Sequence, residues 1–362
     1  YPMQQGGGND GRPYSFGRPS AGGSKAAYPC KSYGQGRINP AYFYGVFDPN
    51  DMRRDVSITM TGSNGKGVEK LIPFVPNSKA EGGGLTLNKW DENRQANPWV
   101  AAQRKSGING PYMRMSEVYL GYAEVCAALG DVVTGKQYLK TVRERSFPQG
   151  LANTDAFIAS FGNDLVRAII EERGFEYAGE GDRRWTLIRS GYLPEDIKRI
   201  KDMTKAMMDG LATKGYYEFE NGNIISAYIW TKLVDAKTIY GHRLTAQCPT
   251  DKVNDPVLYP GWRGQKDNWE EMGLNYGSST PATNLAIKGL FEIVSEEEAA
   301  SLESQGYAKV NWGIDLVDYR DEYDKYLFWD YDYVSAPIYL WPFTPNVMAA
   351  GGFTNGYGFK QE

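Results

Sequence analysis

The feature that most constrains the fold of this chain is a pair of helical patterns joined by a glycine, between residues 109 and 146. In the first pattern, residues recur at i, i+3, i+4 and i+7, the spacing of one face of an α-helix: Tyr119, Tyr122, Ala123 and Cys126. Gly130 follows at the point where a helix often ends in a left-handed residue. Leu139 and Val142 then share a face of the second pattern. The segment therefore predicts a helical hairpin.

This hairpin is similar to the tetratricopeptide unit, a helix-turn-helix repeat of about 34 residues. The repeat has a large residue, a small residue four positions later, a glycine at the turn and a small residue entering the second helix. The chain meets this pattern with Tyr119, Ala123, Gly130 and Gly135. An ordinary αα-hairpin is the alternative. Because one unit cannot bury both of its faces, we expect it to pack on helices from residues 155–211 or from an absent upstream segment, and a fragment to expose an apolar patch there.

Composition limits the class of protein. With 362 residues, of which 41% are apolar, the chain is long enough for one large domain or two ordinary domains with a core. Its net charge of -4, without a run of lysine and arginine, argues against nucleic acid as a partner. No stretch approaches the roughly 20 apolar residues that span a membrane. We therefore expect a soluble globular protein.

The sequence predicts neither a metal site nor a cofactor. Three cysteines, Cys30, Cys126 and Cys248, are too few and too scattered for a zinc site or a disulfide framework. We expect Cys126 in the core, and a bridge between Cys30 and Cys248 stays an open alternative. The single histidine, His242, has no nucleophile motif beside it, so we assign it a structural role.

We expect one unit with three segments. Residues 1–108 are rich in glycine, asparagine, proline and aromatic residues, which predicts long ordered loops that face a ligand. Residues 109–213 carry the helical patterns and form the predicted helical core. Residues 214–362 alternate short apolar runs with turns and form a second loop-rich segment.

Within these segments the patterns predict several further elements. Predicted helices run from Asp155, as a capping residue, to about Gly174 and from Pro194 to Leu211. Predicted strands or short buried segments are Val56–Met60, Ile224–Val234 and Lys237–Leu244. The acidic segment Asp48–Asp55 is expected to close turns on its own backbone, pinned by its two arginines.

A cluster of glutamates and arginines follows the hairpin at helical spacing, between residues 171 and 185. Two carboxylates that share a cleft can act as general acid and base, and Glu176 and Glu180 are the pair to consider. A face so crowded with arginine more often neutralises its carboxylates in ion pairs. We therefore interpret the cluster as a structural network, with a glycoside hydrolase or lyase as the alternative.

Several segments resemble, in the same order, motifs of the SusD/RagB-like family. They are Asp48–Arg54, Arg114–Glu124, Val142–Arg145, Glu171–Glu176 with Gly181–Trp185, Leu187–Gly191, and Tyr339–Phe343 with Asn355–Tyr357. Each motif alone is weak, whereas their common order is specific, and the resemblance extends from about Tyr33 onward. Gly174–Phe175 and Ala178–Gly179 stand where the family usually has bulkier residues.

The resemblance implies a mainly helical fold: an α-α superhelix of tetratricopeptide-like hairpins with long ordered loops and a few short strands. It also implies a surface-exposed outer-membrane lipoprotein that captures a glycan, or in some members a peptide, and covers a TonB-dependent, SusC-like transporter without catalysis. Family members begin with a signal peptide and a lipid-bearing cysteine, and Tyr1–Gly8 shows neither. We therefore expect the C-terminal portion of such a protein, whose membrane association would come only from an N-terminal lipid anchor absent here.

The abundance of aromatic residues favours a sugar ligand. They make up 14% of the chain, and flat rings with polar rims suit the C–H faces of sugars. The candidate platforms are Tyr33, Tyr42, Tyr44, Trp90 and Trp99, with Trp262 and Trp269 as a second cluster. Asn93 and Arg94 are the polar neighbours expected to bind hydroxyl groups. Trp90 is the first candidate, and the alternative is that it anchors its loop to the helices.

Three functions remain open at this point. The first is a non-catalytic glycan-binding protein, and two or three stacking platforms would then give roughly micromolar to millimolar affinity. The second is a hydrolase that uses Glu176 and Glu180. The third is a helical-repeat scaffold that binds peptides or protein partners. The first is the function that we favour.

Overall fold

The computed structural model describes residues 38–63, 69–72, 84–90, 113–147, 150–235 and 283–318, together with 320–321, 332, 334–335, 337–339 and 343–352. The helices are α2 (Met52–Ser57), α3 (Met115–Ala128), α4 (Val132–Arg143), α5 (Thr154–Ala159), α6 (Leu165–Glu176), α7 (Asp182–Ser190), α8 (Leu193–Lys214), α9 (Glu296–Ser304), α10 (Trp312–Asp318) and α12 (Pro345–Gly351), with a π-helical turn η1 (Ala41–Val46) and a 3-10 turn η3 (Glu144–Ser146). The strands are β1 (Ile58–Thr59), β2 (Thr61–Ser63), β3 (Glu69–Leu71), β4 (Thr86–Leu87), β5 (Tyr216–Glu218), β6 (Ile224–Ser226), β7 (Tyr228–Asp235), β8 (Thr283–Lys288) and β9 (Ala308–Asn311).

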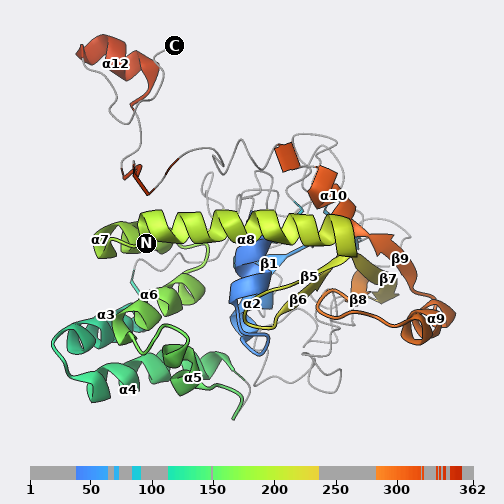
Figure 1. Cartoon of the computed structure of the whole chain (residues 1–362), viewed down its shortest axis with the longest axis horizontal. Coiled ribbons are helices and arrows are strands. Elements are labelled where there is room, and N and C mark those ends of the chain that lie inside the picture. The colour runs from blue at the N-terminus through green and yellow to red at the C-terminus, as the bar shows by residue number, and fades with distance from the viewer. Residues whose placement is uncertain are drawn as a thin grey trace, which may run out of the picture.

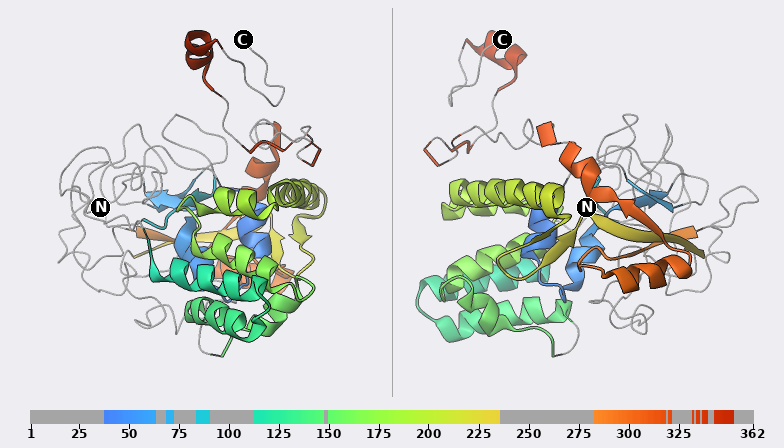
Figure 2. Two further views of the ribbon diagram at one scale, coloured as in Figure 1. Left: turned by 90° about the vertical axis from the view of Figure 1, so that its left-hand side faces the viewer. Right: turned by 45° about the vertical axis from the view of Figure 1, so that its right-hand side comes forward.

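These elements form a helical side and a strand side. Helices α3, α4, α5 and α6 lie together at one end, β5 to β9 lie at the other, and the long helix α8 runs past both (Figure 1). The views in Figure 2 show the same division. The prediction of a mainly helical fold with a few short strands is confirmed.

The predicted helical hairpin is present as α3 and α4, although its first helix begins later than the sequence pattern suggested, at Met115. Gly130 ends the turn with a φ of 84°, a left-handed conformation that glycine adopts without strain. Asp131 then caps α4 by accepting a hydrogen bond from the Thr134 amide at 3.1 Å. A Cβ atom at Gly135 would lie 3.0 Å from the Ala123 carbonyl oxygen, so the two helices approach closely only with glycine there.

One face of this hairpin is buried as the repeat pattern requires. Four side chains of the hairpin pack against one side chain of α5 and two of α6. The hairpin supplies Leu120, Ala123, Leu139 and Val142, α5 supplies Ile158, and α6 supplies Leu165 and Ile169. Cys126 is buried, as expected. Tyr122, however, is 50% exposed, and Leu120 is the buried large residue instead. The buried face of α3 therefore includes Leu120 in place of the predicted Tyr122.

The opposite face of the hairpin is apolar and exposed. Its exposed side chains include Met115, Val118, Tyr122, Val125, Leu129, Val132 and Val133. This matches the expectation that a single unit leaves one face uncovered. Among the described residues, no helix is long and apolar enough to cross a membrane.

The single helix predicted from Asp155 to Gly174 is in fact two helices, α5 and α6. Gly162 and Asn163 both have positive φ, 64° and 66°, and they break the helical path between the two. Asn153, and not Asp155, caps α5, and Asp164 caps α6 through the Arg167 amide at 3.0 Å. The sequence pattern continued across the break because the buried residues on both sides keep helical spacing.

Helix α8 confirms the predicted amphipathic helix and joins the two sides of the molecule. It begins with Pro194 in its first turn and ends at Gly215, which has a φ of 78°. Met207, Met208 and Leu211 on α8 are buried in the main core, which also contains η1 and the strands. Of the predicted strand Val56–Met60, only β1 is extended, because the residues before it close α2.

The three-stranded sheet lies at the strand side with β7 in its centre, paired antiparallel with β8 and β9. Side chains alternate across it. Ile229, Leu285 and Ile287 face the main core. Trp230 pairs with Lys288 on one side and Lys309 on the other, so these three residues share the opposite face. The predicted strand Ile224–Val234 corresponds to β6 and β7, and Lys237–Leu244 lies outside the described residues.

Candidate functional site

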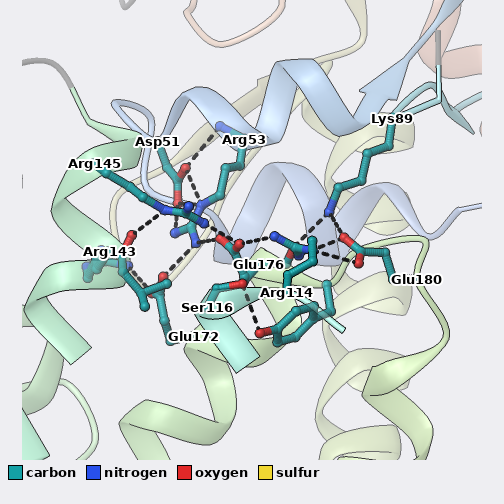
Figure 3. Close-up of polar contacts among 12 residues, drawn as sticks. Asp51, Arg53, Lys89, Arg114, Ser116, Arg143, Arg145, Glu172, Glu176 and Glu180 are labelled. Carbon is teal, nitrogen blue, oxygen red and sulfur yellow. Dashed lines mark hydrogen bonds and ion pairs between the residues drawn. The ribbon is translucent and has the colours of Figure 1, made fainter. Parts of the chain in front are cut away.

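The densest group of polar side chains lies where the hairpin meets α2 and α6 (Figure 3). We call it the interhelical cluster. It consists of Asp51, Arg53, Lys89, Arg114, Arg143, Arg145, Glu172, Glu176 and Glu180. Its members come from five separate parts of the chain, so the cluster ties those parts together.

Local structure places these side chains. Glu172 and Glu176 are one turn apart on α6 and share a face. Asp51 caps α2 through the Arg53 amide at 3.0 Å and also binds the Arg53 guanidinium at 2.6 Å. This confirms that the acidic segment closes a turn that an arginine pins. Arg143 stands in the last turn of α4, which directs it to the same place.

Glu172 is completely buried and bridges two arginines. It lies 2.6 Å from Arg53 and 2.9 Å from Arg143. A buried carboxylate without such partners would be strongly destabilising, so these contacts are a condition for burying it. Arg143 also lies over the Phe157 ring, 3.8 Å from its centroid, which packs the cation against α5.

Glu176 is held by three arginines. Arg114 is 2.6 Å away, Arg53 is 3.1 Å away, and Arg145 donates a further short hydrogen bond. Burial by itself would raise the pKa of this carboxyl group. The charges of Arg53 and Arg145 and the hydrogen bonds from Arg145 and Arg114 outweigh burial, and they lower the pKa from 4.5 to about 2.

Glu180 completes the cluster at its edge. Lys89 lies 2.5 Å from it and Arg114 lies 2.8 Å from it. Lys89 also donates to the backbone carbonyl of Glu176 at 2.7 Å. Burial lowers the pKa of Lys89, and the Glu180 carboxylate only partly opposes that effect.

This geometry favours the structural interpretation of the cluster. A general acid must hold a proton near neutral pH, and the arginines keep Glu176 ionised far below that range. The interpretation as a structural ion-pair network is therefore supported by the contacts themselves. Glu176 therefore does not suit the role of the protonated carboxyl group in glycoside hydrolysis.

A second buried network lies between α6, α7 and α8. Glu171, which is fully buried, accepts from Arg183 at 2.8 Å, and Asp196 accepts from Arg183 at 3.0 Å. The phenol of Tyr42 lies in the same place, with Arg183 5.5 Å from its ring centroid. A Cβ at Gly174 would come within 2.5 Å of the Tyr42 hydroxyl oxygen. This explains why a bulkier residue does not fit at Gly174.

The candidate sugar platforms that the structure describes are buried or half-buried. Tyr44 is 1% exposed and packs edge-on against Phe291, with 5.0 Å between ring centroids. Trp90 is 8% exposed. Neither ring is therefore an exposed platform, and for Trp90 the burial favours the anchoring alternative. Tyr42 is half-buried within the second network, so it is also no open platform.

The remaining candidates cannot be placed, since they lie outside the described residues: Tyr33, Asn93, Arg94, Trp99, Trp262 and Trp269. The structure instead draws attention to the outer face of the sheet, where Tyr228 is 38% exposed. Tyr228, Trp230 and Lys232 alternate along the sequence and could have indicated this face. All three residues lie in the predicted strand Ile224–Val234, whereas the candidate sugar platforms all come from predicted loops.

The described elements define a mainly helical protein. Buried ion pairs join its tetratricopeptide-like hairpin to the other helices and to the part of the chain that carries the small sheets. The sequence matches the SusD family over residues 1–343, so the chain belongs to that family. It is similar to the SusD-like protein P25 of Formosa agariphila, with 28% identity over 160 residues that cover 44% of this chain and 26% of that protein.

A solved structure is also similar, a SusD homolog from Bacteroides thetaiotaomicron VPI-5482. The identity is 22%, the match covers 44% of this chain and 33% of that chain, and the TM-score is 0.31. The matched part thus amounts to about a quarter of the length of the curated relative and a third of that of the solved one.

Proposed function

We propose that this chain is part of a non-catalytic, cell-surface glycan-binding protein that delivers oligosaccharide to a TonB-dependent outer-membrane transporter. The observation that carries the proposal is membership of the SusD family over nearly the whole chain. The interhelical cluster supports its non-catalytic character, because the carboxylate pair Glu176 and Glu180 is neutralised by arginine and lysine.

Binding without turnover is the central claim, and it is tested directly. The purified protein is run by affinity electrophoresis in gels loaded with individual polysaccharides, and the same mixtures are assayed for new reducing ends. Retardation without new reducing ends is the expected result. New reducing ends that disappear in Glu176→Gln would establish the hydrolase instead.

One observation favours the alternative of a scaffold that binds protein partners. The hairpin exposes a row of apolar side chains that includes Val118, Val125 and Leu129. A protein that binds only partners would show no retardation in any glycan gel. Delivery to the transporter is tested by capture of a TonB-dependent protein from detergent-solubilised outer membranes on the immobilised protein. No capture, with glycan binding intact, would limit the function to glycan capture.

A further inference from the structure

The outer face of the three-stranded sheet gathers lysines around aromatic rings. Tyr228, Trp230 and Lys232 alternate on β7, so they point to the same side. The register places Lys288 of β8 and Lys309 of β9 opposite Trp230. Tyr307 precedes Lys309 by two residues and contacts the same group. We call these six residues the lysine face.

The contacts within this face are cation–π contacts. The Lys309 ammonium lies 4.6 Å from the ring centroid of Tyr228 and 5.3 Å from that of Trp230. The ammonium groups of Lys288 and Lys232 lie 5.4 Å and 5.7 Å from the Tyr307 ring centroid. Two aromatic sites therefore hold three like charges on one face, and an anion bound there would reduce the repulsion between them.

No carboxylate in the described part of the chain lies within ion-pair distance of these three lysines. Lys232 donates to the Gln305 carbonyl oxygen at 2.7 Å, a neutral partner. The contrast with the arginines of the interhelical cluster is large, because each of those has at least one carboxylate at 3.1 Å or less. In a chain with a net charge of -4, such a group of unmatched cations is unexpected.

The centre of this face is also short of hydrogen-bond acceptors. Trp230 is 3% exposed, and its indole N–H is buried with no hydrogen-bond acceptor among the described residues. Buried donors are nearly always satisfied, so the described fold supplies fewer acceptors here than is usual. Lysine ammonium groups and an indole N–H are all donors. A ligand that suits them must bring acceptor oxygens and negative charge.

We propose that the lysine face binds the anionic groups of an acidic glycan, that is, a polysaccharide whose sugars carry carboxylate or sulfate. The inference rests on the proposed function and narrows its substrate class. The exposed Tyr228 ring gives a sugar an apolar surface beside the charges, which a simple ion-binding site would not need. An anionic membrane surface is less suited, because membrane-binding faces expose several large apolar side chains for insertion, and among the six residues of this face only Tyr228 exposes one.

The test compares charged and neutral ligands on the whole chain. Affinity electrophoresis and calorimetry use polygalacturonate for carboxylate, dextran sulfate for sulfate, and dextran as the neutral polymer, each at low and high salt. We expect binding to at least one acidic polymer, weakened by salt, and little binding to dextran. The polymer that binds more tightly identifies the preferred anionic group.

Variants assign the binding to this face. The triple variant Lys232→Gln, Lys288→Gln, Lys309→Gln keeps a polar side chain at each position but removes the three charges, and we expect it to lose about tenfold or more in affinity for the acidic polymer. The triple Lys→Arg variant at the same positions keeps the charge and should retain binding. Lys198→Gln on α8 is the matched control, because Lys198 is exposed, pairs with Asp202 at 2.5 Å and lies outside this face.

Each other outcome overturns the inference in a recognisable way. If dextran or another neutral glycan binds as well as the acidic polymers, the proposed function stands and the acidic substrate class fails. If acidic polymers bind equally to the triple Gln variant, the site lies elsewhere. Binding to anionic phospholipid vesicles but to no glycan would replace the glycan by a membrane surface, and no glycan binding at all would remove the proposed function as well.

Discussion

The interhelical cluster and the lysine face use the same kind of charge for different purposes. In the cluster, Arg53, Arg114 and Arg143 each meet a carboxylate at 2.9 Å or less, and Glu172 and Glu176 are almost fully buried. On the lysine face, Lys288 and Lys309 meet aromatic rings, and no carboxylate among the described residues pairs with them. Planar guanidinium groups suit fixed, buried pairs, whereas lysine ammonium groups on flexible stems suit contacts with a ligand.

This difference separates cations that stabilise the fold from cations that are available to a ligand. A cation whose partners are all supplied by the fold has its structural role explained, because removing a partner would leave a buried charge. A cation without an internal partner has no such explanation and directs attention to what binds from outside. Stability should therefore respond strongly to changes in the cluster and hardly at all to changes on the lysine face.

The largest effect is expected from Glu176→Gln. The amide keeps the shape of the carboxylate but removes the charge that Arg53, Arg114 and Arg145 share, so the free energy of unfolding should fall by about 3–5 kcal/mol. Urea unfolding measures the change. Glu303→Gln, at an exposed position on α9, is the control and should have almost no effect.

The same variant tests the absence of catalysis. Glycan binding by Glu176→Gln should be unchanged wherever the protein remains folded, and so should that of Glu180→Gln. Loss of stability below about 1 kcal/mol would contradict the view that the cluster is structural.

Acid should weaken the cluster in a defined pH window. The pKa of Glu176 is about 2 in the folded protein against 4.5 as the ordinary value. Because the folded pKa is lowered, the stabilisation is fully present above about pH 4.5 and is lost as the pH falls toward about 2. The shift corresponds to about 3 kcal/mol. Thermal unfolding from pH 6 to pH 2, compared between the wild type and Glu176→Gln, measures it; equal slopes in that window would contradict the assignment.

The sequence predicted the hairpin because its pattern is local. Ala123, Gly130, Gly135 and Leu139 each perform the role that a helix-turn-helix repeat assigns to them. The break between α5 and α6 lies at a local turn signal, because Gly162 and Asn163 both adopt a positive φ and both residue types favour turns. The prediction passed over this signal because the apolar residues on either side keep helical spacing.

The sites were harder to predict, because their members come together only through tertiary packing. The ion-paired nature of Glu176 followed from local crowding with arginine, but its partners Arg53, Arg114 and Arg145 lie far away in sequence. Conversely, Tyr44 is an aromatic residue in a predicted loop, yet η1 buries it in the main core. Aromatic composition does not distinguish a ring that binds a sugar from one that fills a core.

A smaller effect is expected from Gly174→Ala in the second network. The new Cβ would meet the Tyr42 hydroxyl oxygen at 2.5 Å and Arg183 Nη1 at 2.7 Å, so both side chains must shift. We expect a loss of about 1–2 kcal/mol, since overpacking outweighs the better helix propensity of alanine. Gly121→Ala on α3 is the matched control, because nothing lies within 4 Å of its added Cβ, and it should stabilise the protein by up to about 1 kcal/mol. Stabilisation by both variants would show that Tyr42 and Arg183 are free to move.

The smallest effect on stability is expected from the triple Lys→Gln variant of the lysine face, and it is the sharpest test of the comparison. Removing Lys232, Lys288 and Lys309 breaks no ion pair in the described part of the chain and relieves repulsion between like charges, while the cation–π contacts that are lost contribute about 0.5–1 kcal/mol each at exposed sites. These terms oppose each other, so the free energy of unfolding should change by less than about 1 kcal/mol. Added salt should stabilise the wild type at this face more than the variant, since screening relieves repulsion only where the charges remain. Denaturant unfolding at low and high salt measures both quantities, and a fall as large as that of Glu176→Gln would mean that these lysines, like the arginines of the cluster, are held by the fold rather than kept for a ligand.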